Sequence, residues 1–185
     1  MILFAAYVGL RAGELYALDR SQIDLAAGEV RIERSYGSKT REMTLPKNGR
    51  SRTVILPPPA REALRSTPRR PDQEHVFAGK RGQRLSATTH FHLWNPVRAA
   101  AGTPELDWHH LRHVAGSLMA DRGLSAQDIA YQLGHTDGGR LAQRLYIHTY
   151  EDSAKERIRR AFGENVAPLR PLGDAIETQA AEGGA

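Results

Sequence analysis

Residues 107–135 read DWHHLRHVAGSLMADRGLSAQDIAYQLGH, and this stretch decides the fold. Its first half predicts a helix over residues 108–122, because Asp107 offers a capping carboxylate and Gly123 offers a stop. Three apolar side chains recur on one face at helical spacing and should point into a core: Leu111, Ala115 and Leu118. The first turns carry histidine and arginine instead, where free N–H groups and the helix dipole favour an anion.

The second half of this stretch predicts a shorter helix that begins after Ser125 and ends at Gly134. Ser125 and Asp128 have the spacing of a capping box, and glycine readily adopts the left-handed conformation that closes a helix. His135 should therefore lie on a turn directly behind this helix.

Toward the N-terminus, residues 29–56 carry the pattern of a small antiparallel sheet. Val30 and Ile32 alternate with charged residues, as a half-buried strand requires. The three strands are expected around residues 30–32, 43–45 and 53–56, with turns at residues 36–38 and 47–50. Asn-Gly in the second turn is the strongest hairpin signal, so Lys47 should lie at a hairpin tip.

The remaining patterns are helical. They cover residues 2–8, 11–18, 60–65, 86–101, 140–146 and 151–162. Pro96 should kink or split the helix in which it falls. We therefore expect one α+β domain over residues 1–163, mainly helical with a small three-stranded antiparallel sheet. Residues 164–185 are rich in Ala, Gly, Pro and Glu and are expected to form a disordered tail.

The composition is that of a globular protein without cysteine. The chain has 185 residues, of which 40% are hydrophobic and 25% are charged, and this suits one domain with a sizeable core. The absence of cysteine excludes disulfides, thiolate chemistry and cysteine-based zinc sites. The longest apolar run, residues 1–10, is far too short for a membrane span and does not resemble a secretory signal. We expect a soluble, cytoplasmic protein with no membrane partner.

The charge is unevenly placed along the chain. The formal net charge is +5, but residues 31–70 hold eleven Lys or Arg and three Glu, a local balance of +8. Residues 151–185 hold five basic and seven acidic residues, a balance of −2. A basic middle with an acidic tail indicates a face that meets a polyanion, although an ordinary solvated basic surface is the alternative.

The histidine-rich helix start allows two kinds of site. His109 and Arg112 share one face and His113 borders it, which is a plausible grip for phosphate, although the same residues also suit a capped surface helix. A metal site is the other alternative, because His109 and His113 have i, i+4 spacing and His135 is a third histidine. No Glu or Asp lies within that helix turn to complete a hydrolytic metal motif, so we expect neither a metal nor another cofactor.

Further candidates each have an ordinary structural alternative. Glu14 can orient Arg11 from one turn away, but such a pair is also common on helix surfaces. Lys47 can reach outward from its turn, but lysine also protects sheet edges. Tyr146 lies near the end of a short helix, where tyrosine is more often half-buried packing, and Tyr150 competes with it by position.

The order of these residues is more specific than any one of them. Along the chain it runs Gly-Leu-Arg11-Ala-Gly-Glu-Leu, Lys47, His109-x-x-Arg112, Leu-Gly-His135 and Tyr146-x-His148. This series resembles the tyrosine recombinase family, also called phage integrases, over residues 1–160. Residues 133–140 are similar to integrases of actinobacterial type.

The resemblance implies a site-specific recombinase or integrase of mobile elements. Such an enzyme cleaves and rejoins DNA through a 3′-phosphotyrosine and needs no metal, cofactor or ATP. By this resemblance Tyr146 is the nucleophile and His109 takes its proton. Lys47 protonates the departing 5′-oxygen.

The other roles implied by the resemblance concern the phosphate itself. Arg11, Arg112 and His135 would bind the non-bridging oxygens, since forked cationic donors suit a phosphorane. Glu14 would support Arg11 from behind, and His113 would lie beside the site without touching the phosphate.

Two features depart from the family. Tyr146 lies 11 residues after His135, two more than is common, and the turn at residues 137–139 can absorb the difference. Family members usually carry a helical core-binding domain before the catalytic domain, and we expect it to be absent here. The alternative function is therefore an inactive DNA-binding remnant. The expected partner is double-stranded DNA, bound by a homotetramer in which residues 151–162 pack on a neighbouring subunit.

Overall fold

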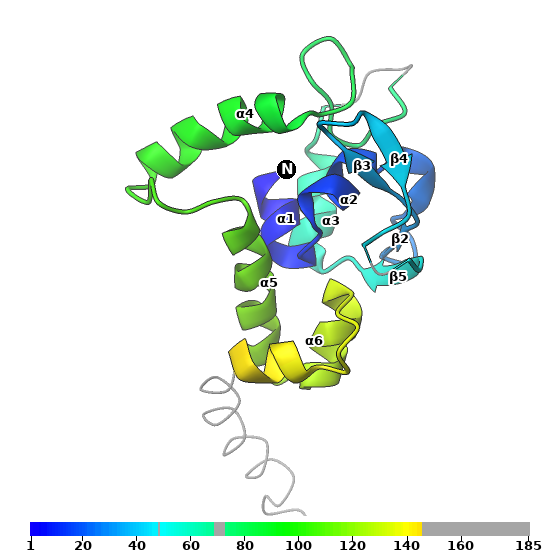
Figure 1. Cartoon of the computed structure of the whole chain (residues 1–185), viewed down its shortest axis with the longest axis vertical. Coiled ribbons are helices and arrows are strands. Elements are labelled where there is room, and N and C mark those ends of the chain that lie inside the picture. The colour runs from blue at the N-terminus through cyan, green and yellow to red at the C-terminus, as the bar shows by residue number, and fades with distance from the viewer. Residues whose placement is uncertain (48, 69–72, 146–185) are drawn as a thin grey trace, which may run out of the picture. The chain divides into compact units, whose positions relative to one another are not determined.

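The computed structural model describes residues 1–47, 49–68 and 73–145, which form a mixture of helices and short strands (Figure 1). The helices are α1 (Ile2–Val8), α2 (Ala12–Ala17), the 3-10 turn Arg20–Gln22, α3 (Pro58–Arg65), α4 (Ala87–Ala100), α5 (His109–Asp121) and α6 (Ala126–Leu133), and residues 140–145 are also helical. The strands are β1 (Ile23–Asp24), β2 (Glu29–Ile32), β3 (Ser35–Gly37), β4 (Glu42–Thr44) and β5 (Arg52–Ile55). The expected α+β class is confirmed.

The two central helices, α5 and α6, are capped as the sequence predicts. The Asp107 carboxylate accepts a hydrogen bond from the His110 amide at 3.1 Å at the start of α5. Ser125 and Asp128 form a reciprocal capping box at the start of α6, with amide bonds of 3.1 and 2.9 Å. Gly134 ends α6 in the left-handed region at φ 71°. These local signals therefore fix where both helices begin and where α6 ends.

The strands form two small antiparallel sheets, where the sequence predicted a single one. The first has the order β1-β2-β5, and the second pairs β3 with β4. Val30 of β2 lies opposite Val54 of β5, and both side chains are fully buried. Met43 and Leu45 are 39% and 63% exposed. Because no side chain of β4 is buried, pairing β4 with the core sheet would bury no apolar surface. The third strand of that sheet is β1 instead.

The turns around β4 differ in place and type from those expected. Tyr36 in β3 pairs with Met43 in β4, so the turn expected at residues 36–38 lies at residues 38–41 instead. The segment at residues 47–50 connects strands of different sheets, so Lys47 does not lie at a hairpin tip. The chain does turn there, since the Gly49 amide donates to the Pro46 carbonyl at 2.7 Å.

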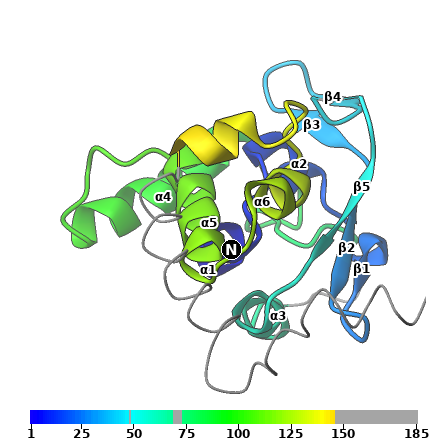
Figure 2. The ribbon, with the colours of Figure 1, turned by 90° about the horizontal axis from the view of Figure 1, so that it is seen from below.

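Two groups of buried side chains hold these elements together. The larger one joins α1, α2, α3 and the first sheet, and it includes Phe4, Leu15, Val30 and Leu56, all fully buried. The smaller one joins α5, α6 and residues 140–145. Figure 2 shows α6 between α5 and the strand β5, and both of these elements contact α6. The packing therefore brings the end of α6 close to α1, α5 and β5.

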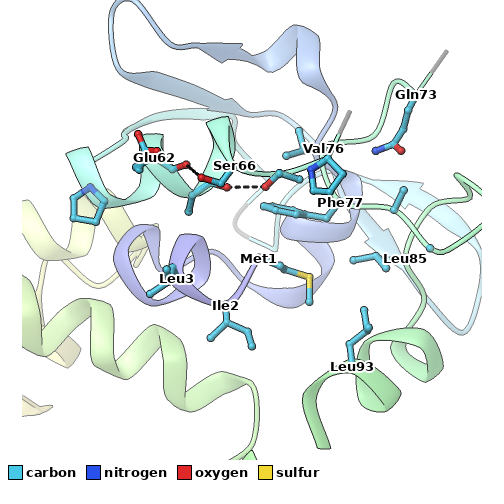
Figure 3. A pocket seen from close by; sticks show the side chains of 16 residues that line it. Met1, Ile2, Leu3, Glu62, Ser66, Gln73, Val76, Phe77, Leu85 and Leu93 are labelled. Carbon is cyan, nitrogen blue, oxygen red and sulfur yellow. Dashed lines mark hydrogen bonds between the residues drawn. The ribbon is translucent and has the colours of Figure 1, made fainter. Parts of the chain in front are cut away.

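The helix α4 runs without interruption through Pro96, so the predicted split does not occur. Among the described residues, no helix is long and apolar enough to cross a membrane. A groove of about 790 Å³ opens beside α1 and α3, and Met1, Val76, Phe77 and Leu85 line its apolar wall (Figure 3). The residues that the sequence singles out as candidates do not line this groove.

Candidate active site

Three arginines converge on the end of α6. Arg112 Nη2 donates to the Leu133 carbonyl at 2.6 Å, and Arg52 Nη2 donates to the same oxygen at 3.3 Å. Arg11 Nη2 donates to the Gly134 carbonyl at 3.1 Å. The last carbonyls of a helix have no partner within the helix, and the helix dipole makes this end negative. The end of α6 therefore gathers positive charge from α2, α5 and β5.

Arg112 is buried where α1, α5 and α6 meet. Its side chain is only 4% exposed, and Nη1 donates to the Gly9 carbonyl at 2.7 Å. Gly9 has φ 75°, and a Cβ there would come within 2.3 Å of Leu133 Cδ2. A glycine is therefore needed at this position, both for its conformation and for the close approach of α1 to α6.

Glu14 holds two of these arginines. It is 1% exposed, and Arg52 donates to its two carboxylate oxygens at 3.0 and 2.9 Å. Arg11 donates to it through Nη1 at 3.2 Å and through its backbone amide at 3.1 Å. Burial alone would raise the pKa of Glu14, but the hydrogen bonds and charges of Arg52 and Arg11 hold the pKa below its usual value. Glu14 is therefore an ionised carboxylate inside a cationic cluster.

The sequence paired Glu14 with Arg11 but missed Arg52. The two residues lie 38 positions apart, and the expected strand began only at residue 53. No signal in the sequence pointed to Arg52, because the burial of Glu14 appears only in the folded chain. Arg11, Glu14, Arg52 and Arg112 are called the arginine cluster below.

Two histidines of the predicted set lie in the field of this cluster. Burial lowers the pKa of His135 to about 4, and the charge of Arg112 adds to this effect. Burial, the neighbouring His113 and Arg112 lower the pKa of His109 in the same way. The positive charge of Arg11 also lowers the pKa of both imidazoles, so His109 and His135 lie near the same two guanidinium groups, those of Arg11 and Arg112. Near neutral pH each is uncharged and can accept a proton at one ring nitrogen.

A hollow of about 280 Å³ opens beside Arg11 of the cluster. It is lined by Arg11, Lys47, Gly134, His135, Thr136, Asp137 and Leu141. The structure thus brings together three predicted residues that are far apart in the chain. Lys47 reaches the hollow from the connection between β4 and β5 and is exposed. His135 lines the hollow, and its Nδ1 is buried without a hydrogen-bond partner within the described ranges.

The ring of His113 packs edge-on against that of His109, with ring centres 5.1 Å apart. His113 is not among the residues that line the hollow. In the part of the chain that the structure describes, no group of three His, Cys, Asp or Glu side chains is arranged to hold a metal ion. The metal alternative therefore has no geometric support there.

The expected nucleophile lies beyond the described residues. Tyr146, its competitor Tyr150 and the following His148 all fall within residues 146–185. The expected helix at residues 151–162 and the expected tail at residues 164–185 fall there as well.

Sequence comparison places the chain among known proteins. The model of the phage integrase family matches residues 1–153. A putative prophage phiRv2 integrase of Mycobacterium tuberculosis is 29% identical over 167 residues, which cover 85% of this chain and 43% of the relative. Tyrosine recombinase XerC of Stutzerimonas stutzeri is 35% identical over 149 residues, covering 76% of this chain and 44% of the relative. The chain spans less than half the length of these relatives.

Structure comparison agrees on the fold. The Tn1549 transposon integrase, solved in complex with transposon right end DNA, superposes with a TM-score of 0.68 at 16% identity. The match covers 88% of this chain and 58% of that one. The helices and small antiparallel strands described above are therefore arranged as in that integrase.

Proposed function

Because this chain belongs to the phage integrase family, we propose that it is the catalytic domain of a site-specific DNA recombinase. The reaction would cleave a DNA strand and rejoin it through a 3′-phosphotyrosine. The observation that carries the proposal is the hollow, where Arg11, Lys47 and His135 meet beside a buried cationic cluster. Such a site suits a phosphodiester, because cationic forks and a neutral imidazole can bind its oxygens without a metal.

In this proposal Tyr146 attacks the phosphorus. A free tyrosine has a pKa of about 10, so its hydroxyl must lose a proton as the bond forms. His109 is the proton acceptor, and its lowered pKa keeps it unprotonated near neutral pH. The new bond joins the tyrosine oxygen to phosphorus, while the bond from phosphorus to the 5′-oxygen breaks.

The cationic groups stabilise the charge that develops on the phosphate. Arg11 is 26% exposed and faces the hollow, so it can bind a non-bridging oxygen directly. Arg112 supplies a second positive charge, and His135 can donate a hydrogen bond to the same phosphate. Lys47 would give a proton to the departing 5′-oxygen. The reverse steps reseal the strand, because the energy of the broken bond is kept in the phosphotyrosine.

The partners in this proposal follow from the family to which the chain belongs. The substrate is double-stranded DNA at a recombination site, and the reaction takes place in the cytoplasm. The assembly would be a tetramer on DNA in which residues 151–162 of one subunit pack on the next. The basic balance of residues 31–70 supports binding to a polyanion.

A covalent trap tests the proposal. The chain is mixed with nicked duplexes carrying candidate attachment sites, so that a short 5′-hydroxyl strand diffuses away after cleavage, and the mixture is quenched with SDS. We expect protein attached to DNA, with the adduct lost in Tyr146→Phe and kept in Tyr150→Phe. Loss in Tyr150→Phe alone would move the nucleophile to that residue. If the chain supplied with a core-binding domain also gives no adduct, the chain is the inactive DNA-binding remnant.

A further inference from the structure

The strongest feature outside the hollow is a buried imidazole on α4. This helix is largely exposed, and only His90 and Trp94 among its side chains are buried. His90 is 5% exposed, its Nδ1 is hydrogen bonded to the Tyr16 hydroxyl, and its ring packs against Trp108 with ring centres 4.0 Å apart at 85°. Tyr16 is itself only 4% exposed. One buried side chain thus joins α2, α4 and the residue that precedes α5.

The protonation of this group is fixed by its surroundings. Burial raises the pKa of Tyr16 to about 12 and lowers the pKa of His90 to about 4. The Tyr16 hydroxyl is therefore the donor, the Nδ1 of neutral His90 is the acceptor, and the imidazole proton lies on Nε2. That nitrogen is buried and has no conventional hydrogen-bond partner in the described ranges. The His90 ring itself packs in a T-shaped arrangement with the Trp108 ring.

Two further hydrogen bonds join α4 to the segment that leads into α5. Trp94 Nε1 and Arg98 Nη1 each donate to the Leu106 carbonyl at 3.1 Å. The Trp94 and Trp108 rings also meet edge to face, with centres 5.5 Å apart. The backbone just before His109 is therefore positioned by contacts with α4.

The other end of the link lies on α2. This helix begins directly after Arg11, and Tyr16 lies in it. His90 consequently lies between α2, which begins directly after Arg11, and Trp108, the residue next to His109. We propose that Tyr16, His90 and Trp108 are positioning residues that set the place of His109 relative to Arg11 for DNA cleavage. The kinetic part of this inference rests on the proposed function, whereas its structural part does not.

A first test needs no DNA. The Tyr16→Phe variant removes one hydroxyl and keeps the ring. The control is Tyr7→Phe, which makes the same change in a half-buried tyrosine on α1. In amide NMR spectra of the full chain, Tyr16→Phe should shift the resonances of His109 and His110, and Tyr7→Phe should leave them in place. Shifts that remain confined to the surroundings of Tyr16 would overturn the inference, whatever the enzyme does.

A second test separates positioning from binding. On the duplex that yields most adduct, Tyr16→Phe should lower the rate constant of adduct formation at saturating protein by about 10-fold, because small displacements of reacting groups slow a reaction strongly. The affinity for the duplex should stay within about 2-fold of that of the unaltered chain, since none of the three residues lines the hollow. Equal losses of rate and affinity, or no loss of rate, would contradict a positioning role.

The chemistry of His90 offers a matched pair of variants. His90→Asn keeps an acceptor near the place of Nδ1, and His90→Leu keeps only bulk. We expect His90→Asn to retain more of the rate than His90→Leu, and Tyr16→Phe combined with His90→Leu to be no slower than His90→Leu alone. Additive losses in the double variant would show that the two side chains act separately. If neither the unaltered chain nor the chain supplied with a core-binding domain forms an adduct, the proposed function fails, and the NMR comparison alone decides the structural part.

Discussion

The arginine cluster and the connection between β4 and β5 each contribute one side chain, Arg11 and Lys47, to the lining of the same hollow, but they are built in opposite ways. In the cluster, Glu14 is 1% exposed and Arg112 is 4% exposed, and both make hydrogen bonds to groups from distant parts of the chain. Lys47 in the connection is exposed, and the adjoining strand β4 has no buried side chain. Groups that bind the phosphate must be in place before DNA arrives, because reorganisation would weaken their stabilisation. A proton donor acts only as the leaving bond breaks, so its position can be less constrained.

The largest effect is expected from Arg112→Lys. Lysine has no planar fork, so it cannot bond the Gly9 and Leu133 carbonyls together while adding charge to the phosphate. The rate of adduct formation on nicked duplexes should fall by about 1000-fold, the size of effect seen when a main donor to a developing anion is lost. Arg122→Lys, at the exposed end of the same helix, is the control and should react normally. A near-normal rate for Arg112→Lys would show that the guanidinium group of Arg112 is not needed for the reaction.

The next effect concerns stability. Glu14→Ala leaves Arg52 as a nearly buried cation, 7% exposed, without its carboxylate partner. The free energy of unfolding should fall by about 3 kcal/mol, because removing one partner of a buried ion pair leaves the other charge buried and uncompensated. Glu62→Ala is the control, since Glu62 pairs with Arg65 at 3.6 Å on the surface. That change should alter the free energy by less than about 1 kcal/mol. Urea denaturation measures both, and equal losses would mean that the cluster is no more coupled than a surface pair.

The effect of Lys47→Ala should be smaller and confined to chemistry. The rate of adduct formation should fall by about 100-fold, a usual contribution of a general acid, while thermal stability is unchanged because Lys47 is exposed. A duplex with sulfur in place of the bridging 5′-oxygen provides a sharper test. A thiolate leaves without a proton, so this duplex should restore the rate of Lys47→Ala but not that of Arg112→Lys.

The control for this experiment is Lys39→Ala, which removes an exposed lysine from the turn between β3 and β4. It should react normally with both duplexes. If sulfur substitution leaves Lys47→Ala as slow as before, Lys47 is not the proton donor to the 5′-oxygen.

The same contrast explains which parts of the structure the sequence could predict. Helix ends depend on neighbouring residues, so the capping box of Ser125 and the left-handed Gly134 were predicted correctly. The positions of Arg11 and His135 around one hollow followed from the family resemblance, and the geometry brings them together.

Strand pairing could not be predicted in the same way. The alternation around Val30 identified a strand, but its partners depend on which other strands have a buried face. Val54 has one and Met43 does not, and this difference appears only when the core is formed. The role of Arg52 was missed for the same reason, since its partner Glu14 lies 38 residues away.

The smallest expected effect is a pH dependence that separates the buried and exposed groups. The pKa of His135 is lowered to about 4 in the folded chain, against about 6.5 for an unperturbed histidine. Between these values the unfolded chain binds the extra proton and the folded chain does not. His135 therefore lowers stability as the pH falls from about 6.5 toward about 4, and it has no such effect above about pH 7. In His135→Gln the melting temperature should accordingly fall less steeply over this range than in the unaltered chain.

His92→Gln is the control, because His92 is an exposed histidine on α4, and the pH dependence of its melting temperature should follow that of the unaltered chain. Equal slopes for all three proteins would mean that His135 is solvated as fully as His92, and the neutral imidazole assigned to the buried side of the hollow would have to be abandoned.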